Sequence, residues 1–126
     1  MKIKGISVVF FYVRDPDRSK AFYSDALGLG KPFLDAGGWV EWELKGANFA
    51  VFKGGSIQTE GSSPERSTTR FSFEVDDIQA TYEELFKKGL HVLSEPQEGE
   101  GFHYVDLRDP DNNLVRFIQL TTKKGA

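Results

Sequence analysis

"FYVRD", at residues 11–15, returns as "FEVDD" at residues 73–77, with Phe, Val and Asp at the same spacing. Each stretch reads as a strand that runs into a helix, because Asp is among the residues that best cap a helix start. Gly28 and Gly89 end the two predicted helices at a similar distance from the cap. The same order of strand, cap, helix and glycine occurs twice, which indicates two related modules.

The residues after each capping Asp favour a helix. Pro16 suits the first helical position, and Asp17 suits the positive end of the helix dipole. This first helix is predicted to run towards Leu27. In the second copy the apolar residues keep the spacing of one helix face: Ile78, Tyr82, Leu85 and Phe86.

Three strand-like runs follow each predicted helix, separated by turns rich in Gly, Asp or Asn. They are residues 32–36, 39–44 and 47–52 in the first module and residues 91–95, 102–108 and 114–120 in the second. We therefore expect an α+β fold, one domain over residues 1–126 with the order βαβββ twice. Module one takes residues 1–53, a polar linker rich in Gly and Ser takes residues 54–67, and module two takes residues 68–122.

The composition excludes several classes of function. A net charge of −3 gives no reason to expect a nucleic-acid partner. The absence of cysteine removes disulfides, thiolate nucleophiles and zinc–thiolate sites, and it fits a reducing compartment.

No stretch approaches the roughly 20 apolar residues of a membrane span. The apolar run at residues 6–13 reads as a first strand, because no small-residue cleavage site follows it. We expect a cytoplasmic protein.

The layout, with "AFYSDALGLG" at residues 21–30 and "RDPDNNLVRF" at residues 108–117, resembles the vicinal oxygen chelate superfamily of glyoxalases, bleomycin-resistance proteins and extradiol dioxygenases. The resemblance extends from about residue 6 to residue 120. It implies two modules that form a cleft-shaped mixed sheet, with the helices on its convex side. It also implies a homodimer, because clefts in short two-module chains of this family are often completed between subunits.

Strand alternation then assigns the residues that face the cleft, if the apolar positions face the helices. The last strand is one example, since Arg116 shares a face with Leu114 and Ile118 rather than with Val115 and Phe117. The expected ligand-facing residues are Phe10, Tyr12, Trp39, Glu41, Arg70, Glu74, His103 and Arg116.

Several of these residues allow a second interpretation. Trp39 could pack in the core or at a dimer interface, and Phe10 and Tyr12 could fill the space between the modules. Glu41 could belong to a solvated strand face, and Glu74 could be a salt-bridge partner.

In metal enzymes of the vicinal oxygen chelate superfamily, the metal ligands are a His from the first strand of a module and a Glu from its last strand. At the corresponding positions this sequence has Val8, Arg70 and Arg116, and residues 47–52 offer no carboxylate or imidazole in any register. A guanidinium cannot ligate a cation and repels it. We therefore expect no metal and no cofactor, and a protein that binds and sequesters a small molecule such as an antibiotic. The other interpretation is a metal-dependent lyase, isomerase or dioxygenase, so enzymatic activity stays open.

Acid–base chemistry without a metal has three candidates, His103, Glu41 and Glu74, while His91 is expected to be exposed or structural. The resemblance also places Arg70 and Arg116 side by side, and two guanidiniums there need anionic partners. Those partners are either Glu74 and Glu41 or a carboxylate or phosphate of the ligand.

Overall fold

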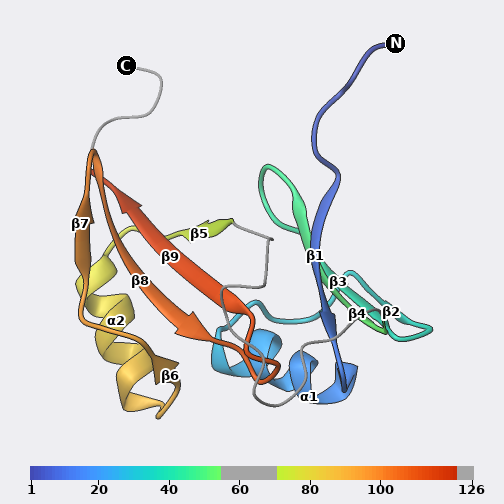
Figure 1. The fold of residues 1–126 in the computed structure, drawn as a ribbon. Coiled ribbons are helices and arrows are strands. Elements are labelled where there is room, and N and C mark those ends of the chain that lie inside the picture. The colour runs from blue at the N-terminus through green and yellow to red at the C-terminus, as the bar shows by residue number, and fades with distance from the viewer. Residues whose placement is uncertain (55–70, 122–126) are drawn as a thin grey trace. The chain divides into compact units, whose positions relative to one another are not determined.

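The computed structural model describes residues 1–54 and 71–121 (Figure 1). The chain divides into two compact units, Met1–Gly61 and Ser62–Ala126, each with its own sheet and helix. The expected α+β fold with two modules is confirmed. Most of the predicted linker, and the candidate Arg70, lie outside the described residues.

The first unit has a mixed sheet with the strand order β1-β4-β3-β2. Its elements are β1 (Val8–Val13), α1 (Pro16–Lys20), the π-helix η1 (Ala21–Ala26), β2 (Leu34–Ala36), β3 (Trp39–Trp42) and β4 (Asn48–Lys53). β1 runs parallel to β4, whereas β4, β3 and β2 pair antiparallel. The predicted order βαβββ is confirmed in this unit.

The helix of the first unit begins at the predicted cap. The carboxylate of Asp15 accepts hydrogen bonds from the backbone N–H groups of Asp17 and Arg18, at 3.1 and 3.4 Å. α1 continues directly as η1, whose C-cap is Leu27, so the predicted helix towards Leu27 is present, with its second half π-helical. The helix propensities of the residues gave no signal for this change, and π-helical turns frequently mark functional or packing constraints.

Trp42 ties the helical segment to the sheet. Its Nε1 donates to Ser24 Oγ at 2.9 Å and to the carbonyl oxygen of Gly30 at 3.1 Å, which joins β3 to η1 and to the loop after it. The buried side chains of this unit alternate along its strands, and they include Phe11, Val13, Val40, Trp42, Phe49 and Val51, with Tyr23 from η1. Burying each large apolar side chain contributes about 1.5–3 kcal/mol, so this helix-covered face carries the core of the unit.

The second unit has the strand order β5-β9-β8-β6, with β7 paired to β8. Its elements are β5 (Ser72–Glu74), α2 (Ile78–Lys87), β6 (His91–Val92), β7 (Gln97–Gly99), β8 (Phe102–Arg108) and β9 (Leu114–Leu120). β5 runs parallel to β9, and the other pairs are antiparallel. The sequence predicted one strand at residues 91–95, but two short strands pair with β8. Pro96 separates them because proline has no N–H to donate to a strand ladder.

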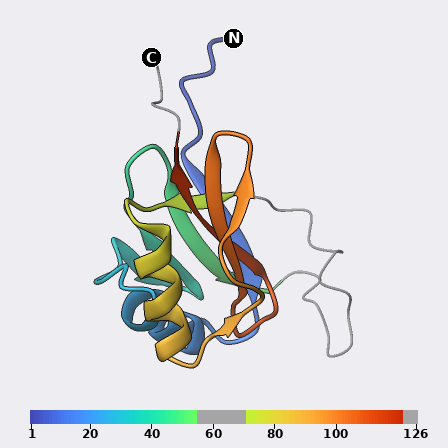
Figure 2. The same ribbon diagram turned by 90° about the vertical axis from the view of Figure 1, so that its left-hand side faces the viewer.

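α2 lies along one face of this sheet (Figure 2). Asp77 caps it as predicted, since its carboxylate accepts from the backbone N–H of Ala80 at 3.0 Å. The side chains buried on this face are Ile78, Leu85, Val105, Leu107, Val115 and Phe117. In each unit, the opposite face of the sheet is called the helix-free face below.

The turn between β8 and β9 fixes the register of the last hairpin. Asp109 Oδ1 accepts from the backbone N–H groups of Asp111 and Asn113, at 2.9 and 2.8 Å. Asn112 adopts a φ of 68°, in the left-handed region that Asn tolerates better than most residues. With the turn held in this way, Asp106 lies directly opposite Arg116.

Candidate functional site

Four aromatic side chains form a cluster on the helix-free face of the first unit, called the aromatic face. The strand register places Phe10 beside Ala50 and places Phe52 between Tyr12 and Trp39. Ring centroids lie 5.1 Å apart for Phe10 and Trp39, 5.5 Å for Trp39 and Phe52, and 5.5 Å for Phe10 and Tyr12. The small side chain of Ala50 lets the rings approach across β4.

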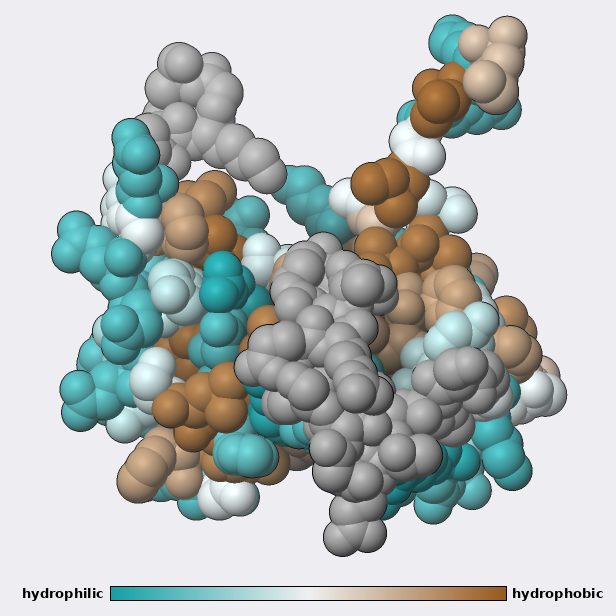
Figure 3. Space-filling view, in the orientation of Figure 1, coloured by the Kyte–Doolittle hydropathy of each residue, from teal (hydrophilic) through white to brown (hydrophobic). Residues whose placement is uncertain are grey.

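The sequence correctly predicted that Phe10, Tyr12 and Trp39 share one face. Phe52 was missed, although alternation along β4 would have found it, because Val51 is buried and Phe52 points the other way. Tyr12 is 44% exposed, and the other three rings are half-buried. Figure 3 shows apolar side chains gathered over the strands of this unit. The aromatic face thus provides flat apolar surface that the core of the unit does not use.

Glu41 holds the Trp39 ring of the aromatic face through a hydrogen bond. Its Oε1 accepts from Trp39 Nε1 at 2.9 Å, and its Oε2 accepts from Asn48 Nδ2 at 2.7 Å. The carboxylate is therefore hydrogen-bonded through both oxygens and fixes the Trp39 ring, which differs from the solvated role that the sequence also allowed. Glu43 is exposed.

Arg116 is the central charged residue on the helix-free face of the second unit. Its Nε donates to Asp106 Oδ1 at 2.8 Å and its Nη2 donates to Asp106 Oδ2 at 2.9 Å, while its guanidinium carbon lies 3.9 Å from the Tyr104 ring centroid. The hydrogen bond with Asp106 raises the pKa of Arg116 above its ordinary value, against the opposing effect of burial. Asp106, which was not among the anionic partners considered for Arg116 in the sequence, is its partner within this unit. Counting residue pairs outward from the turn between β8 and β9 would have identified Asp106 as this partner.

Of the remaining candidates of the second unit, Glu74 shares the helix-free face with Arg116, because its strand neighbour Ile118 alternates with Arg116. Glu74 is exposed on β5 beside Ile118, and the neighbouring Ser72 lies beside Arg116. Because Arg70 lies outside the described residues, its expected position next to Arg116 stays a prediction.

His103 lies on the helix side of its sheet and not with Arg116. It shares the alternation of the buried residues Val105 and Leu107, and it pairs with Gln119. Gln119 Oε1 in turn accepts from the backbone N–H of Ile78 at the start of α2, at 2.7 Å. The sequence grouped His103 with the ligand-facing residues, but the alternation of β8 puts it on the opposite face from Arg116.

The described residues do not fit a divalent metal. Val8 is aliphatic, and Arg116 occupies the expected carboxylate position with its guanidinium already paired. Two acids of the helix-free faces, Glu41 and Asp106, have both oxygens in hydrogen bonds, and Glu74 on the second of these faces is exposed. Within residues 1–54 and 71–121, no three His, Asp or Glu side chains gather in a way that could hold a metal ion.

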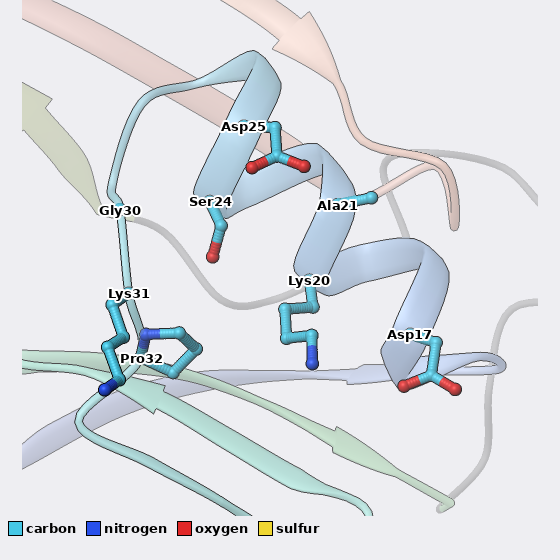
Figure 4. A pocket seen from close by; sticks show the side chains of 8 residues that line it. All are labelled: Asp17, Lys20, Ala21, Ser24, Asp25, Gly30, Lys31 and Pro32. Atoms are coloured by element: carbon cyan, nitrogen blue, oxygen red, sulfur yellow. The ribbon is translucent and has the colours of Figure 1, made fainter.

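A polar hollow of about 400 Å³ lies beside the helical segment of the first unit (Figure 4). Its lining residues are Asp17, Lys20, Ala21, Ser24, Asp25, Gly30, Lys31 and Pro32. Lys20 Nζ is 2.8 Å from Asp35 Oδ2, and this hydrogen bond raises the pKa of Lys20. Two acids and two lysines balance in charge, and the lining contains no aromatic ring. The hollow therefore offers less recognition chemistry than the aromatic face, and nothing in the sequence predicted it.

No helix in the described ranges is long and apolar enough to cross a membrane.

Comparisons with known proteins bear on the family and on the fold. Residues 5–117 match the family model of the glyoxalase/bleomycin resistance protein/dioxygenase superfamily. The uncharacterized protein YetH of Bacillus subtilis (strain 168) is 30% identical over 116 residues, which cover 89% of this chain and 95% of YetH.

Two solved structures are similar in fold. TnmS3, an antibiotic binding protein from Streptomyces sp. CB03234, gives a TM-score of 0.76 at 20% identity and covers 95% of this chain and 98% of its own. A lactoylglutathione lyase from Agrobacterium tumefaciens gives a TM-score of 0.72 at 22% identity, with coverages of 94% and 95%.

Proposed function

Because the chain belongs to the glyoxalase/bleomycin resistance protein/dioxygenase superfamily, we propose that it is a small-molecule binding protein that sequesters a flat ligand without a metal. The observation that carries this proposal is the aromatic face, where Phe10, Tyr12, Trp39 and Phe52 contact one another on the side of the sheet away from the helix. The superfamily alone does not select binding over catalysis, since function depends on the site and not on the fold.

The orientation of Trp39 supports a binding role. Its indole N–H is held by Glu41, so the ring is fixed before a ligand arrives and little side-chain entropy is lost on binding. Offset or edge-to-face contacts with such a ring contribute about 0.5–1.5 kcal/mol beyond the burial of apolar area. A planar ligand that contacts two or more of these rings would gain this contribution more than once.

The side chains present also favour binding without a metal. Arg116 stands at the position where the resembled enzymes have a metal-binding carboxylate, and it forms a two-point ion pair with Asp106. Val8 stands at the position of their histidine. A cation at that place would meet a guanidinium in place of a negatively charged oxygen.

Three further expectations belong to this proposal: the protein acts in the cytoplasm, it forms a homodimer, and its ligand is an antibiotic or a molecule of similar shape. TnmS3, similar in fold, is itself an antibiotic binding protein, and this supports the choice of ligand class.

The test is calorimetric titration with 2-naphthamide, a flat neutral probe. We expect saturable binding, and Trp39→Ala should weaken it several-fold to about tenfold, because one stacking contact of roughly 1 kcal/mol is lost. The matched control is Phe86→Ala on α2, which removes an exposed aromatic ring from the other unit and should leave the affinity unchanged. Equal affinities for Trp39→Ala and the unaltered protein would refute the proposal.

A further inference from the structure

Arg108 is a second arginine on the helix-free face of the second unit, and the sequence did not single it out. It is the last residue of β8 and alternates with the buried Leu107, so it points to the same side as Asp106. Its cross-strand neighbours are His91 on β6 and Leu114 on β9. His91 is exposed, whereas Arg108 is half-buried.

The guanidinium of Arg108 is unpaired within residues 1–54 and 71–121. Its Nη1 is buried and has no hydrogen-bond partner, and no ion pair joins the side chain to any described residue. Buried polar groups in folded proteins almost always have a partner, and a charged donor is the costliest to leave without one. Arg108 therefore needs an acceptor from outside these residues.

The nearest acids are already engaged. Asp106, two residues earlier on the same face, has both oxygens bonded to Arg116. The carboxylate of Asp109, the next residue in the chain, holds the turn by accepting from the backbone N–H groups of Asp111 and Asn113 and from Asn113 Nδ2. A turn of either carboxylate towards Arg108 would break hydrogen bonds that it already makes.

Arg108 and Arg116 therefore differ in what they can offer. Arg116 uses Nε and Nη2 on Asp106 and is stacked on Tyr104, so its charge is compensated inside the unit. Arg108 keeps the planar set of donors that suits a carboxylate or a phosphate through two parallel hydrogen bonds. An imidazole donor, His91, lies beside it.

We propose that Arg108, flanked by His91, is an anion-binding site on the second unit that takes a carboxylate or phosphate group. The site goes beyond the proposed binding on the aromatic face and does not depend on it. A carboxylate from an organic ligand and free inorganic phosphate share the chemistry that Arg108 recognises, so both are tested.

The experiment is an NMR titration of backbone amides with three probes, sodium phosphate, sodium benzoate and neutral benzamide, at constant ionic strength. At least one of the two anions should shift the amides of His91 and Arg108 saturably, and benzamide should not. Arg108→Gln should weaken this binding at least about tenfold, because hydrogen bonds to a charged donor are lost. Phosphate alone would indicate a phosphate site, and benzoate alone would indicate a carboxylate ligand.

Two variants keep the test decisive. Lys87→Gln removes a positive charge from an exposed position on α2 and should leave the affinity unchanged. Arg108→Lys keeps the charge but loses the planar donors, so it should bind more weakly than Arg108 and more tightly than Arg108→Gln, even if the latter folds poorly. The proposal is overturned if no anion shifts these amides, which would leave water as the partner of Arg108. It is equally overturned if Arg108→Gln binds as before or if Lys87→Gln loses as much affinity.

Discussion

Replacement of Asp106 by Asn tests whether the ion pair with Arg116 organises the second unit. The substitution keeps the shape of the side chain but removes the charge and one of two acceptors, which lie 2.8 and 2.9 Å from the guanidinium nitrogens. Asp106 and Arg116 have side-chain exposures of 17% and 35%, so the pair is neither a surface pair nor fully buried.

The magnitude follows from this intermediate burial. Exposed ion pairs contribute about 0–1 kcal/mol, whereas breaking a buried pair costs about 3–5 kcal/mol. For a half-buried, two-point pair that is also stacked on Tyr104, we expect a loss of about 1–3 kcal/mol in the free energy of unfolding. In urea this corresponds to a fall of roughly 1 M in the unfolding midpoint.

The assay is urea denaturation of Asp106→Asn, Arg116→Gln and the double variant, so that the coupling energy of the pair is measured directly. Asp76→Asn is the matched control, because Asp76 is exposed in the same unit. A coupling energy below about 0.5 kcal/mol, no larger than the additivity error of such cycles, would refute the reasoning.

The pH dependence of this effect has a definite sign. The pKa of Arg116 is raised in the folded protein, first by the hydrogen bond to Asp106. The stability from such a group is complete below its unfolded pKa and is lost as pH rises through its folded pKa. This window lies in strongly alkaline solution, so the loss measured for Asp106→Asn should be the same at about pH 7 and about pH 9.

Three other outcomes are expected. Protein dialysed against Zn²⁺ or Ni²⁺ and then against buffer should retain no stoichiometric metal in elemental analysis, since Val8 and Arg116 replace donor residues; one metal per chain would contradict this. Asn112→Ala should lower the free energy of unfolding by about 1 kcal/mol because of its positive φ, whereas Asn112→Gly should not, and equal losses would show that φ is not the cause. Lys20→Ala, which breaks an exposed pair with Asp35, should leave the unfolding midpoint in the same denaturation assay almost unchanged, and a clear fall in the midpoint would mean that this pair is more than a surface contact.

Local patterns predicted the parts of the fold that depend on neighbours in the sequence. Asp15 and Asp77 cap their helices because an Asx cap needs only the next two or three backbone N–H groups. The shared face of Phe10, Tyr12 and Trp39 followed from alternation along strands with one apolar side.

Features that depend on pairing between strands were harder to predict. The partner of Arg116 is set by the register of the last hairpin, which the turn at Asp109 fixes, and the sequence interpretation looked to acids in other strands. His103 sits near the start of β8, where the apolar pattern had not yet shown which face is buried. The lack of a partner for Arg108 among the described residues could not be predicted, because it depends on where every nearby carboxylate is engaged.

The central claim is that the aromatic face binds a flat ligand without a metal, and NMR mapping of 2-naphthamide on chelator-treated protein tests it most directly. We predict saturable shifts centred on Phe10, Trp39 and Phe52, with the same affinity before and after chelation. Binding that appears only after Zn²⁺ or Ni²⁺ is restored, or shifts that leave these three residues unchanged, would contradict the account.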